Sequence, residues 1–235
     1  MLLARSAMRL FLAFAIVFAP PYLLAQKRLG VFVPVVEQTR KIEKTLAQDE
    51  NLSGMEITVF AGYNDFQQST MSLTYDYLLT THPYAQKNAC KPVTQLMCDG
   101  KNTFQYRILS QKDQFGEAPG VMGVIDILGL KGMKEFIPSV LKPKYSQLKR
   151  VFKMVDLGPM LILGNADYIL VESYLVGQLK ALYKTNFYDL GASSKVPCPV
   201  VCAPSGNLPS IALRPESLMV LGLGGVAEGK GVSHD

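Results

Sequence analysis

Short apolar runs alternate with amphipathic stretches along the first part of the chain. Ile42 and Leu46 lie four residues apart within 37–48, a spacing typical of one helix face. Gly54 interrupts the chain before a β-rich run, and a second helical stretch precedes the run that ends at Thr80. The predicted elements are strands at 31–35, 55–60 and 75–80 and helices at 37–48 and 64–71. Three strands joined by two helical crossovers predict a βαβαβ unit with a parallel sheet.

The same alternation continues into a second unit. A helical stretch after His82 and strands at 93–97 and 104–109 complete the first unit, and the polar segment 110–120 is the predicted crossing. The second unit is predicted to contain strands at 121–124, 150–155 and 168–171, a helix that follows the first of these strands and runs to about 141, and helices at 157–163 and 175–183. The run 196–203 then returns to the first unit as a strand. The pattern predicts an α/β fold with two lobes and a hinge of two connections, the lobes being 26–110 with 196–221, and 111–195.

Two segments, 75–81 and 166–174, have nearly the same pattern. In each, an acidic residue precedes a short apolar run, and hydroxyl or carboxylate side chains follow it. Such a run predicts a buried strand with polar groups at its carboxyl end. Since ligands bind at that edge of an open α/β sheet, two such edges indicate two lobes that face one cleft. The repeated pattern therefore favours a ligand-binding protein.

Residues 1–25 have the features of a secretory signal peptide. Arg5 and Arg9 form a positive start, and an apolar stretch follows them. Ala25 lies where cleavage is expected, although Leu23 is larger than the usual small residue two positions before it. The alternative is an uncleaved membrane anchor, for which the apolar run is short. The segment predicts a periplasmic protein.

The composition supports a folded body and limits the classes of partner. Hydrophobic residues make up 49% of the 235 residues, enough for two cores. The formal charge falls from +5 to +3 when the two arginines of 1–25 are removed, and the lysines are scattered among acidic residues except in 142–150. A solvated helix or turn explains that cluster better than an anion-binding patch, and nucleic-acid binding has no support. The glycine-rich tail 222–235 is predicted to be disordered.

Four cysteines in a secreted chain favour disulfides. Cys90 and Cys98 flank a segment that can fold back on itself, which predicts a local bridge between them. Cys198 and Cys202 lie in an extended run, where strand geometry separates their Cα atoms by ~13 Å, beyond the ~7 Å limit of a disulfide. A metal site is the alternative, but the chain has only two histidines and the cysteine spacings fit no zinc pattern. We expect no metal and no cofactor.

Three longer motifs occur in the order that a known family would require. They are Tyr75-Asp-Tyr-Leu-Leu-Thr-Thr-His-Pro-Tyr-Ala85, Leu163-Gly-Asn-Ala-Asp-Tyr-Ile-Leu-Val-Glu-Ser-Tyr174 and Gly191-Ala-Ser-Ser-Lys-Val-Pro197. Together they resemble the periplasmic solute-binding proteins of the phosphate/phosphonate ABC-transporter type, over about residues 30–220. The resemblance implies the type II periplasmic binding fold, with a mainly parallel sheet in each lobe. It also implies a small-molecule or lipid ligand and a membrane transporter component as partners.

The resemblance further implies which residues line the pocket, because this family builds it from groups that follow the strands of both lobes. In the first lobe these residues are Pro34, Val35, Thr80, Thr81, His82 and Tyr84. In the second lobe they are Glu172, Ser173 and Tyr174. The alternative is structural: Thr80 and Thr81 cap the helix that follows, and Tyr84 packs in the core.

One departure from the family bears on the ligand. Phosphonate receptors resemble one another in a Ser/Thr-rich turn that opens a helix of the second lobe and holds the anion. The matching region here, 118–125, contains no Ser or Thr and offers the apolar residues Val121, Met122, Val124 and Ile125 instead. This predicts an amphipathic, lipid- or sterol-like ligand whose hydroxyl meets Glu172, with a phosphate-type oxyanion as the alternative. The opposing interpretation is that 121–125 is a buried strand remote from the ligand.

Catalysis and a sensor or scaffold role are the rival functions. His82 lies near Cys90 and Cys98 in the sequence, but no third group that would orient a nucleophile is evident. Asp156 and Asp167 are better explained as cap or turn residues. We therefore expect a non-enzymatic receptor. The chain has no long apolar patch or heptad run, which favours a monomer.

Overall fold

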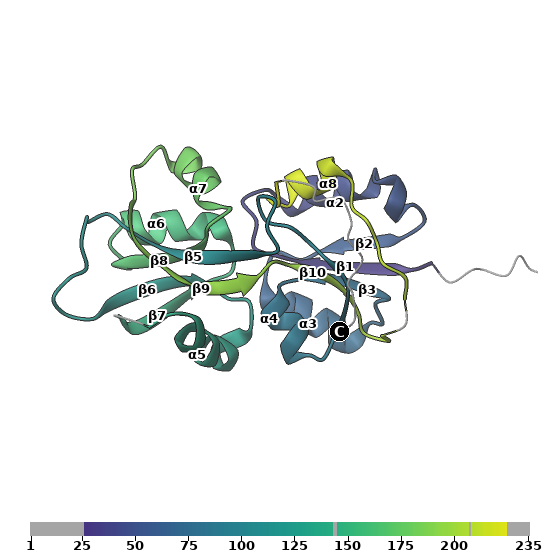
Figure 1. Cartoon of the computed structure of the whole chain (residues 1–235), viewed down its shortest axis with the longest axis horizontal. Coiled ribbons are helices and arrows are strands. Elements are labelled where there is room, and N and C mark those ends of the chain that lie inside the picture. Colours follow the sequence, from purple (N-terminus) through teal and green to yellow (C-terminus); the bar gives the residue numbers. More distant parts are fainter. Residues whose placement is uncertain (1–25, 143–144, 207, 225–235) are drawn as a thin grey trace, which may run out of the picture.

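Two five-stranded sheets lie side by side and divide the molecule into two lobes (Figure 1). The computed structural model describes residues 26–142, 145–206 and 208–224. The predicted signal segment 1–25 lies outside the described residues, as does the predicted tail apart from 222–224. Within the described residues, no helix is long and apolar enough to cross a bilayer.

The first lobe is built on a sheet with the strand order β2-β1-β3-β10-β4. β1 pairs in parallel with β2 and β3, whereas β10 runs antiparallel to β3 and β4. Helices α2 and α8 cover one face of the sheet and α3 and α4 the other (Figure 1). The bounds are β1 Arg28–Phe32, α2 Thr39–Ala47, β2 Glu56–Val59, α3 Tyr63–Ser72, β3 Tyr77–Thr80, α4 His82–Lys87, β4 Lys91–Gln95, β10 Val200–Ala203 and α8 Pro215–Val220.

The second lobe has the strand order β7-β6-β8-β5-β9. β6 pairs in parallel with β7 and β8, and β5 runs antiparallel to β8 and β9. Helix α5 covers one face of this sheet, and α6 and α7 lie on the other (Figure 1). The bounds are β5 Thr103–Ser110, β6 Gly120–Ile125, α5 Gly129–Val140, β7 Tyr145–Val151, α6 Leu157–Ile162, β8 Tyr168–Glu172, α7 Val176–Tyr183 and β9 Tyr188–Pro197.

The alternation of strands and helices predicted from the sequence is confirmed in both lobes, but each sheet is mixed rather than mainly parallel, because β10 and β5 run antiparallel to their neighbours. Ile42 and Leu46, the residues that indicated the first helix, are fully buried against the sheet. β3 and β8, the two runs with similar patterns, are buried along their whole length. Continuous burial is expected for central strands that helices cover on both faces.

The predicted crossing between the lobes at 110–120 is wrong. β5, which was expected in the first lobe, pairs with β8 and β9 and belongs to the second sheet. The chain crosses instead at 96–102, between β4 and β5, and returns at 198–199, between β9 and β10. The predicted strand 196–203 is therefore two strands in different lobes. Apolar alternation indicates that a segment is a strand, but it does not identify the neighbour with which the strand pairs.

The predicted disulfide between Cys90 and Cys98 is also wrong. Cys90 is bonded to Cys202, with their Cα atoms 5.6 Å apart, and Cys98 to Cys198, with theirs 6.0 Å apart. The reason is the antiparallel pairing of β4 with β10, which places Cys90 beside Cys202 at one end of the strand pair and Cys98 near Cys198 at the other. As predicted, Cys198 and Cys202 are not bonded to each other.

Candidate functional site

The carboxyl ends of the parallel strands in both lobes point into the gap between the lobes. Residues directly after β1 and β2 line one wall of a cleft of about 650 Å³. The end of β6 and the residues after β7 line the opposite wall. This is the edge at which open α/β sheets bind ligands, and the volume is within the usual range of ligand pockets.

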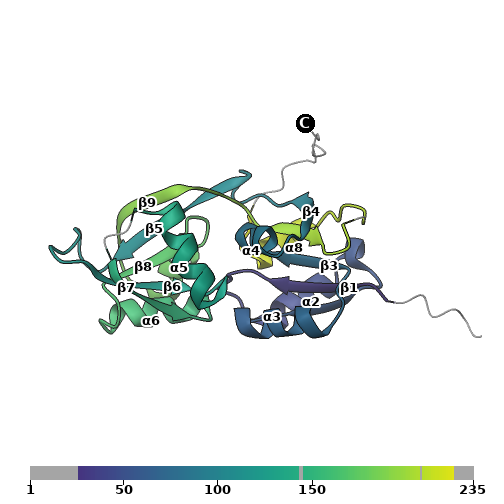
Figure 2. The same ribbon diagram turned by 90° about the horizontal axis from the view of Figure 1, so that it is seen from below.

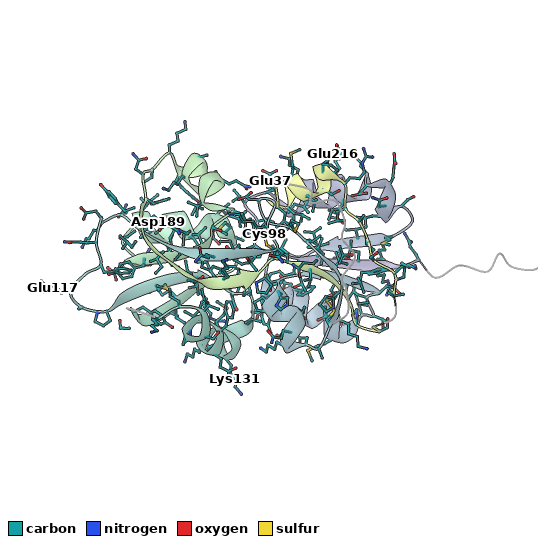
Figure 3. All side chains as sticks on the ribbon, viewed as in Figure 1. Glu37, Cys98, Glu117, Lys131, Asp189 and Glu216 are labelled. Atoms are coloured by element: carbon teal, nitrogen blue, oxygen red, sulfur yellow. A yellow bond between two sulfur atoms is a disulfide. The ribbon has the colours of Figure 1, made fainter. Side chains whose placement is uncertain are left out.

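Most of the residues that line this cleft are apolar. The first lobe contributes Phe32, Val33, Pro34, Val35, Val36, Phe60 and Ala61, and the second contributes Ile125, Phe152, Met154, Val155 and Leu182. The polar lining residues are Glu37, Gln38, Thr39, Arg40 and Lys153. Figure 3 labels Glu37 beside the gap between the lobes. An apolar wall with a few polar groups at its edge suits a ligand with a large apolar body.

The two lobes contact each other across the gap. The Nζ of Lys87, on α4, donates a hydrogen bond of 2.9 Å to the carbonyl of Leu128 at the start of α5. Gly129 faces Tyr63: a Cβ at this glycine would lie only 2.9 Å from the tyrosine ring. A Cβ at Gly62 would lie 3.6 Å from Phe152 of the other lobe, an ordinary van der Waals distance. The structure thus has the lobes in contact, and the contact at Gly129 has no room for a side chain.

Replacing Gly129 by Ala is expected to hold the lobes apart. The new methyl group would clash with Tyr63, so small-angle scattering should give a larger radius of gyration and solute affinity should fall. Gly129 has φ +73°, so the substitution also strains the backbone by about 1 kcal/mol. Gly164→Ala is the matched control, because Gly164 has φ +71° and nothing within 4 Å of its Cβ position. Identical scattering of the two variants would contradict the role of this contact.

Of the apolar residues expected to contact a ligand, Pro34 and Val35 line the cleft. Val121 and Met122 do not: they lie near the start of β6, where Met122 is 1% exposed. The residue of β6 that reaches the cleft is Ile125, at the carboxyl end of the strand. The apolar wall is therefore made by one residue of 118–125 together with residues that follow β1, β2 and β7.

Thr80 and Thr81 place two unpartnered hydroxyls at the carboxyl end of β3. Both residues are buried, and neither Oγ1 has a hydrogen-bond partner. Thr81 occupies the N-cap position of α4, but its side chain makes no capping hydrogen bond. Buried polar groups are seldom left unpaired, because each one costs about 1–3 kcal/mol. The capping alternative therefore does not explain Thr81.

Glu172 is the third buried side chain with an unpartnered oxygen among the described residues. It ends β8 and is 2% exposed, and its Oε2 has no hydrogen-bond partner. The carboxyl lines a void of about 10 Å³ beneath α5, together with Tyr106 and the apolar residues Val124, Ile125, Ile127, Met133, Phe136, Ile137 and Leu170. Burial raises the pKa of Glu172 to about 7. The side chain is therefore partly protonated near neutral pH and can donate or accept a hydrogen bond.

The remaining predicted site residues have other surroundings. His82 lines a second inter-lobe cleft of about 470 Å³, between α4 and α5, and burial lowers its pKa. Tyr84 packs on Phe66 in the core of the first lobe, as the structural alternative proposed, and its hydroxyl lies 3.2 Å from the Oγ1 of Thr70. Tyr174 is buried against Phe104.

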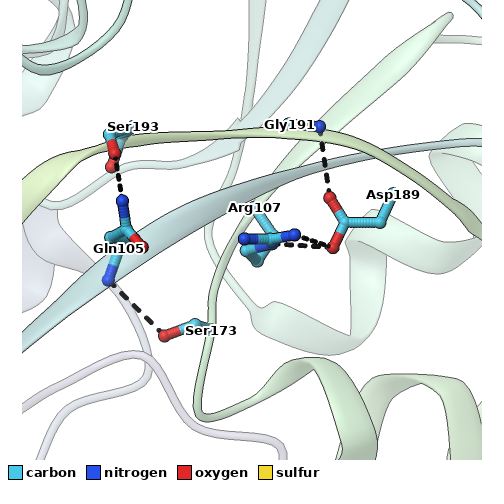
Figure 4. A network of polar contacts seen from close by, with 6 residues as sticks. All are labelled: Gln105, Arg107, Ser173, Asp189, Gly191 and Ser193. Carbon is cyan, nitrogen blue, oxygen red and sulfur yellow. Dashed lines mark hydrogen bonds and ion pairs between the residues drawn. The ribbon is translucent and has the colours of Figure 1, made fainter.

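Ser173 belongs to a polar network on the strands of the second lobe (Figure 4). Its Oγ accepts a hydrogen bond of 3.5 Å from the backbone N–H of Gln105, and the Gln105 side chain donates to the carbonyl of Ser193. Arg107 and Asp189 form an ion pair in the same network. These contacts link β5 to its neighbours β8 and β9. They give Ser173 a structural partner.

The loop that opens α5 is occupied by a carboxylate from the chain itself. The prediction that 118–125 forms the turn before a helix is wrong, because residues 120–125 form strand β6. The turn that precedes α5 is formed by residues 126–129. The Oδ1 of the fully buried Asp126 accepts hydrogen bonds from the backbone N–H groups of Leu128, at 3.3 Å, and Gly129, at 2.7 Å. Arg150 forms an ion pair with the same carboxylate. An internal anion thus takes the donors that a bound oxyanion would need.

Several lining residues were not identified from the sequence. Phe60, Phe152 and Leu182 make much of the apolar wall. Phe60 directly follows β2 and Phe152 directly follows β7, so their positions after strands were the available signal. No group of three or more metal-ligating side chains occurs within the part of the chain that the structure describes.

Similar folds occur among solved solute-binding proteins, although neither a protein-family model nor a curated protein matches the sequence. A binding-protein component of an ABC phosphonate transporter from Pseudomonas aeruginosa aligns with TM-score 0.56 and 9% identity, over 77% of this chain and 69% of that one. A Xanthomonas citri protein bound to ATP aligns with TM-score 0.55 and 11% identity, over 83% and 80%.

A third neighbour is a periplasmic His/Glu/Gln/Arg/opine family-binding protein from Silicibacter pomeroyi in complex with lysine. It aligns with TM-score 0.52 and 11% identity, over 76% of this chain and 83% of that one. At such identities the likeness concerns the fold. The chain has the two-lobed α/β fold of the type II periplasmic solute-binding proteins.

Proposed function

We propose that this protein is a periplasmic receptor that captures an amphipathic solute between its lobes and delivers it to a membrane transport system. The observation that carries the proposal is the apolar cleft of about 650 Å³ at the facing strand ends of the two lobes. The unpartnered oxygens of Thr80, Thr81 and Glu172 lie at the ends of β3 and β8, but they are buried and do not line this cleft. The ligand we infer is lipid- or sterol-like.

A phosphate- or phosphonate-type ligand is the second candidate, and the fold of the Pseudomonas aeruginosa neighbour is its support. Asp126 argues against it. Its carboxylate already accepts from the N–H groups that open α5, so these donors are not free to bind a second anion.

An enzymatic function has less support than a receptor. The four cysteines are all bonded in disulfides, so none is a thiolate nucleophile for His82. The side chain of Asp167 accepts a hydrogen bond of 2.7 Å from the backbone of Val121, which is a structural use. A scaffold role is distinguished from a receptor by motion, because only a receptor closes around a solute.

The direct test is to identify what the protein carries. Native mass spectrometry of protein exported to the periplasm of its host should detect a co-purifying amphipathic molecule. Removing that molecule and adding it back should make the particle more compact in small-angle scattering. A co-purifying phosphate or phosphonate would favour the second candidate. Scattering that does not respond to any bound molecule would favour a scaffold.

Leu182→Gln is expected to weaken binding of the apolar part of the solute. Leu182 lines the cleft and is 48% exposed, so its replacement removes about 1 kcal/mol of apolar contact. That loss corresponds to roughly a fivefold higher dissociation constant for a fluorescent apolar probe. Leu163→Gln is the control, because Leu163 is 73% exposed on the same lobe and does not line the cleft. Equal probe affinities of the Leu182→Gln and Leu163→Gln variants would show that the apolar probe does not bind in this cleft.

A further inference from the structure

Two cationic side chains line the cleft without a partner among the described residues. Arg40 is in the first turn of α2, in the first lobe, and Lys153 follows β7 in the second lobe. Neither side chain makes a hydrogen bond or ion pair with another described residue. Both are exposed, so their charges are available to a molecule that enters the cleft.

The only acidic residue in the lining does not cancel these charges. Glu37 forms an ion pair with Lys41 of α2, so its charge is already balanced. α2 has no side-chain cap and no acidic residue in its first turn, and its dipole therefore adds to the positive potential near Arg40. The cleft thus combines apolar walls with an uncompensated positive edge contributed by both lobes.

We propose that the solute is an amphipathic carboxylate, whose head lies between Arg40 and Lys153 and whose hydrocarbon body lies on the apolar walls. This inference rests on the proposed receptor function and deepens it. A cation from each lobe favours the anion most when the lobes are together, because only then do both charges act on one head group. The charged end of the solute would therefore promote closure, and its apolar body would supply most of the contact area.

The test compares probes that share one tail and differ in the head. Dodecanoate, dodecanol and dodecyltrimethylammonium are titrated below their micelle-forming concentrations, with calorimetry or displacement of a fluorescent apolar probe as the readout. We expect dodecanoate to bind about tenfold more tightly than dodecanol, and the cationic probe to bind more weakly than both, since exposed ion pairs contribute modestly. Added salt should reduce the preference for the acid.

Paired variants identify the residues responsible. Arg40→Gln/Lys153→Gln should bring the acid-to-alcohol affinity ratio close to one, by weakening dodecanoate more than dodecanol. The control Lys44→Gln/Lys131→Gln also removes one exposed cation from each lobe, but neither residue lines the cleft, and the ratio should persist. Figure 3 shows Lys131 on the outside of the second lobe.

The outcomes separate this inference from the function on which it rests. Equal binding of the acid and the alcohol, or a ratio that the Arg40→Gln/Lys153→Gln variant leaves intact, would overturn the carboxylate and leave the apolar-solute receptor standing. Failure of all three probes to bind, in protein freed of co-purifying material, would overturn both.

Discussion

Removing both disulfides is expected to lower the free energy of unfolding by about 8 kcal/mol, whereas removing either one costs only about 3 kcal/mol. The Cys98–Cys198 bridge lies within the loop that the Cys90–Cys202 bridge closes. Cys90 and Cys98 are 8 residues apart in the sequence, and Cys198 and Cys202 are 4 apart. With one bridge in place, the second closes a loop of only about 12 residues, but the last remaining bridge closes one of about 100. The double loss is comparable with the whole stability of many domains.

The measurement is urea unfolding of Cys90→Ala/Cys202→Ala, Cys98→Ala/Cys198→Ala and the variant that lacks all four cysteines. The two pairs are matched because all four side chains are at most 5% exposed. A loss in the four-cysteine variant that equals the sum of the two single-bridge losses would contradict the nested-loop argument.

The two bridges should differ in their effect on the lobes. Cys98 lies in the first connection between the lobes and Cys198 in the second, so their bridge ties the two hinge segments together. Cys90 and Cys202 are both in the first lobe. We expect only Cys98→Ala/Cys198→Ala to broaden the range of lobe separations that scattering detects in the ligand-free protein. The same change from Cys90→Ala/Cys202→Ala would show that the effect is general loosening.

Glu172→Gln is expected to stabilise the protein in a pH-dependent way. Burial raises the pKa of Glu172 from 4.5 to about 7, so between these values the folded state keeps a proton that the unfolded state has lost. The free energy of unfolding of the parent protein therefore falls as pH rises through this window. One pKa unit corresponds to about 1.4 kcal/mol. The loss in the free energy of unfolding that Glu172 causes therefore reaches about 3 kcal/mol above pH 7 and is absent below pH 4.5.

Urea titrations at pH 4 and pH 8 measure the difference. Glu172→Gln should gain about 3 kcal/mol relative to the parent protein between the two pH values, because glutamine cannot ionise. Glu117→Gln controls for the loss of one negative charge, since Glu117 is exposed at the far end of the second lobe (Figure 3). Parallel pH dependence of the parent and Glu172→Gln would contradict a buried carboxyl with a raised pKa. The measurement is made on solute-free protein, because a bound solute that donates a hydrogen bond to Oε2 would stabilise the ionised carboxylate.

Only part of the candidate site could be predicted from the sequence. Thr80, Thr81 and Glu172 were identified because polar residues directly follow buried apolar runs, and these three side chains hold the unpartnered buried oxygens of the described structure. Pro34 and Val35, which the family resemblance implied because they end the first strand, line the cleft. Tyr84 follows the same pattern but packs in the core, because one residue type serves a pocket or a core equally well.

The succession of strands and helices was available from the chain alone, because hydrophobic periods of two and of 3.6 residues are local properties. The partners of each strand were not. β5 joined the second sheet and Cys90 bonded to Cys202, 112 positions away, through packing that no neighbouring residue encodes. The cleft depends on the same long-range assembly: Arg40 and Lys153 line one cleft only because the two lobes meet at their strand ends.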